Sequence, residues 1–200
     1  MDTAAPAPAH GPSGRERDGD RTPVLTVGTV VWLASELMFF SGLFAAYFTL
    51  RATADGDWPP SDVELEILTS GLFTLGLVLS SGTMQLAVRA IARGRLPAFR
   101  GWLVATLVLA AAFIGNQAHE WSSLEFHADT HSYGSAFYVM TGFHGIHVIG
   151  GMLAMVLLLG RAGSRRFGAG ELPAVEMVSY YWHFVDVVWI GLWATLFLLK

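Results

Sequence analysis

The chain has 200 residues, of which 53% are hydrophobic and 14% are charged, and its formal net charge is −4. This composition is too apolar for an ordinary soluble domain, and the chain lacks the excess of basic residues that nucleic-acid binding requires. Because the chain contains no cysteine, a disulfide, a thiolate metal site and thiol catalysis are all excluded.

Residues 1–23 form the first segment, which mixes Pro, Gly, Ala and charged residues without any apolar run. Such a composition cannot bury enough surface to offset the entropy lost on ordering, so we expect a disordered cytoplasmic tail. No apolar stretch followed by a small-residue cleavage site precedes residue 24. We therefore expect no signal peptide.

The stretches that follow the tail are long and apolar enough to cross a bilayer, which requires about 20 mostly apolar residues. We predict an all-α integral membrane bundle of five transmembrane helices within residues 24–200. The predicted spans cover residues 24–50, 67–88, 102–118, 135–159 and 175–199. No internal repeat is visible, so the inverted-repeat plan of many transporters is not supported.

Charge in the connections predicts the orientation of the bundle. Arginines cluster in the tail and in the second and fourth connections, whereas acidic residues fill the first and third. Because short loops rich in Arg or Lys stay on the cytoplasmic side, we expect a cytoplasmic N-terminus and a C-terminus outside. The inner arginines are Arg15, Arg17, Arg21, Arg89, Arg93, Arg95, Arg100, Arg161, Arg165 and Arg166.

A single glutamate, Glu36, lies within the first predicted span. At the helical rise it is roughly 18 Å from the cytoplasmic end, which places it near mid-bilayer. A carboxylate there costs at least about 2.5–3.5 kcal/mol on insertion scales. We therefore expect Glu36 to be protonated, paired, or turned toward a protein interior.

The fourth and fifth predicted spans carry further polar residues. His144 and His147 are three residues apart and are predicted to share one helix surface. Glu36, His147 and Asp186 lie at similar depths, roughly 16–18 Å from the inner ends of their helices. This similarity predicts that the three side chains form one hydrogen-bonded cluster. A stripe at spacings of three and four in the last span comprises Glu176, Ser179, His183, Asp186, Ile190 and Trp193.

Other interpretations of these residues stay open. The histidines and acids could satisfy one another and hold the helices in register without any chemistry. His144 and His147, with a third histidine on a neighbouring helix, could instead ligate a metal ion. Two of His144, His147 and His183 could also be the axial ligands of a haem. A further group, His119, His127 and His131, follows the third span at spacings of eight and four, which match no ligand template and predict a solvated loop.

Four segments together resemble subunit III of the haem-copper oxidases, and they are most similar to the cytochrome c oxidase form. They read "ASELMFFSGLFAAYF", "NQAHEWSSLEF", "YGSAFYVMTGFHGIHVIGG" and "VEMVSYYWHFVDVVWIGLW". The resemblance covers residues 24–200 and implies an accessory subunit of a terminal respiratory oxidase in a bacterial plasma membrane. The long form of the family has seven helices, and this chain resembles the last five. The glutamate in "SEL" favours the cytochrome c class over the five-helix quinol oxidases, for which the resemblance implies an aspartate.

The resemblance also implies that this chain holds no redox metal or other cofactor, since haem and copper belong to partner subunits I and II. It implies direct binding to subunit I, bound phospholipid, support of proton uptake and protection of the catalytic subunit. Further small subunits or a respiratory supercomplex are additional expected partners. The matching polar positions, none expected to be catalytic, are Glu36, His144, His147, Glu176, His183 and Asp186. A freestanding proton-conducting membrane protein is the alternative from a different class.

Overall fold

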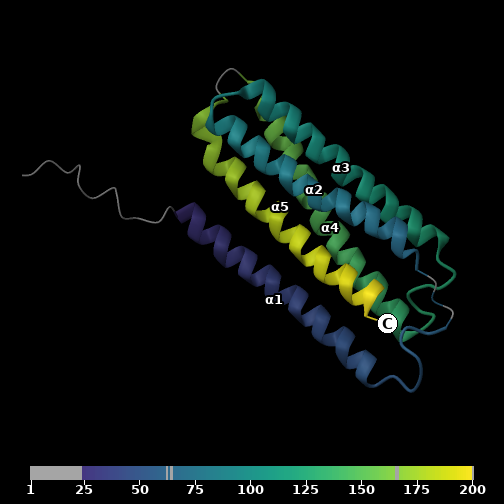
Figure 1. The fold of residues 1–200 in the computed structure, drawn as a ribbon. Coiled ribbons are helices and arrows are strands. Elements are labelled where there is room, and N and C mark those ends of the chain that lie inside the picture. Colours follow the sequence, from purple (N-terminus) through teal and green to yellow (C-terminus); the bar gives the residue numbers. More distant parts are fainter. Residues whose placement is uncertain (1–23, 62, 64, 165–166, 200) are drawn as a thin grey trace, which may run out of the picture.

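A computed structural model describes residues 24–61, 63, 65–164 and 167–199 of the protein. These residues form five long helices and no strand (Figure 1). The helices are α1 (Val24–Ala52), α2 (Ile67–Ala92), α3 (Leu96–Ser123), α4 (Ser132–Arg161) and α5 (Leu172–Trp193). A 3-10 turn, η1 (Ala169–Glu171), precedes α5, and a π-helical turn, η2 (Ala194–Leu198), continues it.

All five helices are long and apolar enough to cross a membrane, which confirms the predicted fold class. The predicted tail, residues 1–23, lies outside the described residues. The third helix, α3, is longer at both ends than its predicted span of 102–118. Hydropathy marks only the part of a helix that crosses hydrocarbon, and the hydrogen-bonded backbone continues into the headgroup region.

Local sequence explains where these helices begin. Pro97 and Pro173 lie in the first turns of α3 and α5, where a backbone N–H has no intrahelical partner to lose. Gly94, with a φ of 68°, makes the tight turn between α2 and α3. That left-handed conformation favours glycine, because a Cβ would crowd the backbone there.

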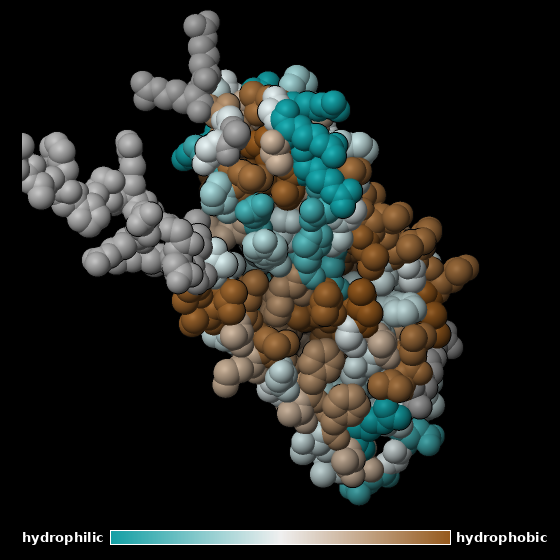
Figure 2. All heavy atoms as spheres, turned by 60° about the vertical axis from the view of Figure 1, so that its left-hand side comes forward, coloured by the Kyte–Doolittle hydropathy of each residue, from teal (hydrophilic) through white to brown (hydrophobic). Residues whose placement is uncertain are grey.

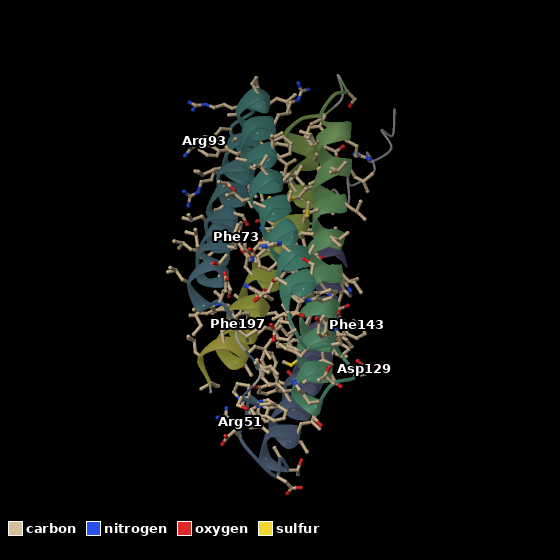
Figure 3. All side chains as sticks on the ribbon, turned by 90° about the vertical axis from the view of Figure 1, so that its right-hand side faces the viewer. Arg51, Phe73, Arg93, Asp129, Phe143 and Phe197 are labelled. Atoms are coloured by element: carbon tan, nitrogen blue, oxygen red, sulfur yellow. The ribbon has the colours of Figure 1, made fainter. Side chains whose placement is uncertain are left out.

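Hydrophobic and hydrophilic side chains occupy different levels along the long axis of the bundle. Figure 2 shows hydrophobic atoms across the middle of one face and hydrophilic atoms gathered toward its ends. Figure 3 shows Arg93, between α2 and α3, at one end of the bundle, and Arg51 and Asp129 toward the other. An apolar belt with charged side chains at either end is the surface expected of a protein that crosses a bilayer.

The fifth helix is bound to α2 through an indole–hydroxyl ladder, in which three tryptophans of α5 donate their N–H to hydroxyls of α2. Its members are Trp182–Ser80 (2.8 Å), Trp189–Thr74 (2.9 Å) and Trp193–Ser70 (2.6 Å). Residue numbers rise on α5 as they fall on α2, so the two helices are antiparallel. Because lipid cannot accept an indole proton, the ladder fixes the register of α5 against α2.

The first helix lies at the side of the bundle, along α4 and α5 (Figure 1). It runs parallel to α5: the ring of Trp32 stacks on Tyr181 at 4.9 Å, and the Tyr47 hydroxyl donates to the backbone oxygen of Thr195 at 3.2 Å. In the apolar 18-residue window of α1 only 11% of residues are buried, against 56% in the last span. Most of the surface of α1 therefore contacts something other than this chain.

Candidate functional site

Glu36 and His147 meet where α1 contacts α4. Glu36 Oε2 lies 3.0 Å from His147 Nε2, and the two side chains are only 22% and 15% exposed. Glu36 Oε1 accepts a hydrogen bond from the indole Nε1–H of Trp32, one turn earlier, at 3.1 Å. His147 Nδ1 lies 2.7 Å from the backbone oxygen of Phe143. The intramembrane glutamate is thus paired within the protein, and each nitrogen and oxygen of the pair has a partner.

Aromatic side chains enclose this pair. Phe40 of α1 meets the His147 ring edge-on at 5.0 Å, and Phe39 lies against it at 6.2 Å. From α5, the Tyr181 hydroxyl donates to the backbone oxygen of His147 at 2.9 Å. Because these contacts leave little of either side chain exposed, the electrostatic interaction between Glu36 and His147 is stronger than it would be in water.

A hollow of about 330 Å³ lies beside the pair, between α1, α4 and α5. Gly150 and Ala154 leave this space open because their side chains are small. Apart from an indole N–H and a phenol, the lining is apolar, so its chemistry suits a hydrocarbon chain rather than an ion. The lining residues are Trp32, Gly150, Ala154, Met177, Val178 and Tyr181.

His144 does not share the surface of His147, which corrects the prediction from their spacing. It is buried, with 1% of its surface exposed, and its ring stacks on Trp189 of α5 at 4.7 Å. Phe113 of α3 meets the ring edge-on at 6.0 Å. Neither ring nitrogen has a hydrogen-bond partner among the described residues. Positions three apart differ by about 60° around a helix, enough to face different neighbours.

Asp186 belongs to a second cluster, so the predicted cluster of Glu36, His147 and Asp186 is wrong. The hydroxyl of Ser81, on α2, donates to Asp186 Oδ2 and lies 2.8 Å from His183 Nδ1. His183 Nε2 lies in turn 3.2 Å from the hydroxyl of Ser179. Equal depth did place Asp186 level with Glu36, but the face of α5 that carries it points toward α2.

Two residues of the predicted stripe, His183 and Asp186, contact α2 through Ser81, and Trp193 contacts it through the ladder. Ser179 contacts His183 on its own helix. Ile190 is 45% exposed, so it does not share the buried face of the other stripe residues. Glu176 is half-buried near the start of α5, and no hydrogen bond joins it to either cluster within the described part of the chain.

The histidines near the third connection have separate surroundings. His131 caps α4, its Nδ1 accepting from the backbone N–H of Gly134 at 2.8 Å. His119 lies on the last turns of α3 and lines a polar cleft of about 620 Å³ with Glu66 and Glu120. Across the described residues, no three His, Asp or Glu side chains are grouped closely enough to hold a metal ion. The predicted solvated loop also contains an anchor, Phe126, which is 2% exposed.

Sequence reasoning missed the contacts made by the hydroxyls of α2, which complete both the ladder and the cluster of Ser81, His183, Ser179 and Asp186. The spacing of residues did indicate the contacts of the ladder. Trp182, Trp189 and Trp193 are spaced by seven and four residues, and the hydroxyls they contact are spaced by six and four. Similar spacings on two helices of opposite direction indicate side chains that can meet.

Known proteins resemble this chain over nearly all of its length. A sequence model of the family described as cytochrome c oxidase subunit III matches residues 18–199. The chain is 44% identical to the probable cytochrome c oxidase subunit 3 of Nocardia farcinica (strain IFM 10152), with 100% of both chains covered.

Two further relatives agree. Identity is 45% to the probable cytochrome c oxidase subunit 3 of Mycobacterium tuberculosis (strain ATCC 25618 / H37Rv), over 90% of this chain and 91% of the relative. It is 39% to the cytochrome c oxidase subunit 3 of Thermostichus vulcanus, over 86% of each chain. The matched residues include all five helices and both polar clusters. This multi-pass membrane protein therefore belongs to the cytochrome c oxidase subunit III family.

Proposed function

We propose that this protein is the accessory subunit III of an aa3-type cytochrome c oxidase in a bacterial plasma membrane. Family membership carries the proposal, because a subunit 3 works in a complex with other oxidase subunits. In this role subunit I is the direct neighbour, and subunits I and II bind the haem and copper. The chain itself takes no part in bond making or electron transfer.

The surroundings of the histidines support an accessory role. His144 is enclosed by aromatic rings, His147 is bonded to Glu36, and His183 is bonded to Ser81. Each of these contacts serves helix packing within the bundle. None brings two imidazoles to a shared point from which they could act as axial ligands of a haem.

The Glu36–His147 pair and the adjacent hollow support roles in proton uptake and lipid binding. A carboxyl and an imidazole in hydrogen-bond contact can exchange a proton, because each group can act as a proton donor and as a proton acceptor. The hollow is apolar and lies among membrane-spanning helices, so its natural occupant is an acyl chain of a phospholipid. Both features lie where α1 packs against α4 and α5.

The proposal orients the bundle with the α2–α3 connection in the cytoplasm. That connection and the helix ends beside it carry Arg89, Arg93, Arg95 and Arg100. The opposite end carries acidic residues, among them Asp55, Asp57 and Asp129, with Arg51 as the exception. In this proposed orientation, Leu199 and the end of α5 lie outside.

Purification with a mild detergent tests the proposal. The affinity-tagged chain should bring with it a haem- and copper-bearing partner that oxidises reduced cytochrome c. Isolation of the chain without any haem-bearing partner would point to a freestanding membrane protein and overturn the proposal. A partner that oxidises quinol and lacks the dinuclear copper centre would identify the quinol oxidase form instead.

A strain that lacks this chain tests the accessory role. The remaining complex should keep its haem and copper content and its initial turnover, but it should take up protons more slowly and lose activity sooner during turnover. Restoring the wild-type gene is the matched control. Loss of all initial turnover, with haem content unchanged, would show that the chain takes part in the chemistry.

A further inference from the structure

The hydrogen bonds on the two sides of His147 determine where its protons lie. The backbone oxygen of Phe143, 2.7 Å from Nδ1, can only accept a hydrogen bond, so Nδ1 carries a hydrogen. An imidazole with a hydrogen on Nδ1 has two forms. It is either neutral, with a lone pair on Nε2, or an imidazolium with hydrogens on both nitrogens.

Each form requires a proton between His147 Nε2 and Glu36 Oε2, which are 3.0 Å apart. A neutral imidazole offers a lone pair, so Oε2 must be protonated and donate. An imidazolium donates from Nε2, so Oε2 must be the acceptor. Without that proton two lone pairs would face each other at hydrogen-bond distance, one of them on a charged carboxylate, and the contact would be repulsive.

We propose that Glu36 and His147 form a binding site for a single proton, and that this proton closes α1 onto α4. The occupied pair has no net charge in either form, which suits its position among membrane-spanning helices. Loss of the proton leaves a net negative charge and opposed lone pairs. The side chains then separate, and α1 moves away from α4 at this level.

The surroundings allow this movement. Around the pair α1 is otherwise held by ring contacts, such as Phe39 against Phe143 at 5.0 Å and Trp32 against Tyr181 at 4.9 Å. Such contacts are not directional in the way a hydrogen bond is, and the hollow beside Trp32 gives the ring room. The Trp32 indole remains a donor to Oε1 whether or not Oε2 is protonated.

The titratable groups that face the pair come from two helices. From α5, Tyr181 donates its hydroxyl to the backbone oxygen of His147, so it does not compete for Nε2 or Oε2. On α4 itself, His144 lies one turn earlier and is directed toward Phe113 and Trp189. The proton between Glu36 and His147 is therefore shared by those two side chains alone in this arrangement.

Infrared spectroscopy of the purified complex tests the occupancy. With ¹³C-labelled glutamate, the bands of Glu36 are identified by their loss in Glu36→Gln. At neutral pH we expect either a protonated carboxyl or a carboxylate accompanied by imidazolium bands of His147. A carboxylate accompanied by a neutral imidazole would overturn the proposal. The infrared bands do not depend on turnover or on the electron donor. They can therefore contradict the proposed proton site without contradicting the proposed function.

Distance measurements test the closure. Because the chain contains no cysteine, spin labels can be placed at Leu37→Cys and Ile146→Cys, whose native side chains are 56% and 64% exposed. Raising the pH should lengthen this distance in the wild-type background. In the Glu36→Gln background it should stay constant, because the carboxamide donates to Nε2 and accepts from Trp32 without any titrating proton.

A label pair across the ladder, Leu72→Cys and Ile190→Cys, is the control and should not change with pH. A wild-type distance that stays constant while the infrared bands show loss of the proton would overturn the proposal, as would equal lengthening in Glu36→Gln. The wild-type distance should lengthen over the same pH range in which the infrared bands show loss of the proton.

Discussion

Helices α1 and α5 run parallel beside each other, yet the protein holds them in different ways. The last span, which contains α5, has 56% of its apolar window buried, and three tryptophans bind it to α2. For α1 the buried share is 11%. Its polar contacts to the other helices include the Glu36–His147 pair near the middle and two bonds from Tyr47 and Arg51 to backbone oxygens near its end.

The difference shows which helix organises the bundle. Lipid tails are as apolar as leucine, so helices in a membrane are held by close packing and by hydrogen bonds rather than by hydrophobic burial. The fifth helix has both, and α1, α2 and α4 all pack against it. The first helix has few of either, so its exposed residues, such as Val31, Met38 and Phe48, are available to lipid or to another subunit.

Replacement of the central tryptophan should give the largest effect. Trp182 is fully buried, donates to Ser80 and packs against Gly151, so Trp182→Ala should cost about 3–5 kcal/mol. Trp32→Ala on α1 is the matched control and should cost much less, because Trp32 is 46% exposed. The melting temperature of the purified complex measures both. Equal losses would show that α1 is as firmly held as α5.

A charge at the α1–α4 contact should have the next largest effect. Glu36→Lys places an ammonium beside His147 and costs at least about 2.5–3.5 kcal/mol on insertion scales. Little of this variant should appear in purified oxidase, as measured by quantitative mass spectrometry of its subunits. Glu36→Gln should assemble normally, because an amide keeps both hydrogen bonds. Wild-type yield of the lysine variant would mean that position 36 faces water or headgroups.

Close packing between α4 and α5 can be tested at a glycine. A Cβ added at Gly151 would lie 2.8 Å from the Trp182 ring, so Gly151→Ala should cost about 1–3 kcal/mol through overpacking. Gly145→Ala, on the same helix, meets nothing within 4 Å and is the control. Thermal inactivation of the complex should separate the two variants. If it does not, α5 can shift to make room, and it is less rigid than the ladder indicates.

Sequence alone predicted the five spans and the family, and it placed Glu36 level with His147. The depth of a residue in the membrane follows from counting residues at the known helical rise, so it can be predicted without a structure. The direction in which a side chain points does not follow in the same way, because it depends on how each helix is rotated against its neighbours. Asp186 illustrates this limit: it lies at the predicted depth but is bonded to Ser81 of α2.

The roles of the serines and threonine of α2 could not be predicted from the sequence either. Nothing in the sequence assigns a partner helix to Ser70, Thr74 or Ser80, because a hydroxyl in hydrocarbon can also bond to its own helix backbone. Only the rotation of α5 turns an indole toward each of them. Hydropathy is insensitive to that rotation, since the whole of α2 is apolar enough to span the membrane.

The smallest expected effect concerns a single rung of the ladder. Trp189 donates to Thr74 at 2.9 Å, and both side chains are buried. A double-mutant cycle with Thr74→Val and Trp189→Phe should give a coupling of about 0.6 kcal/mol, and at most about 1.7, as measured for other interhelical bonds in membranes. The same cycle with Glu36→Gln and Trp189→Phe is the control and should give no coupling, because those residues share no contact. A rung without measurable coupling would mean that packing of the indole rings, rather than their N–H groups, holds α5 in register.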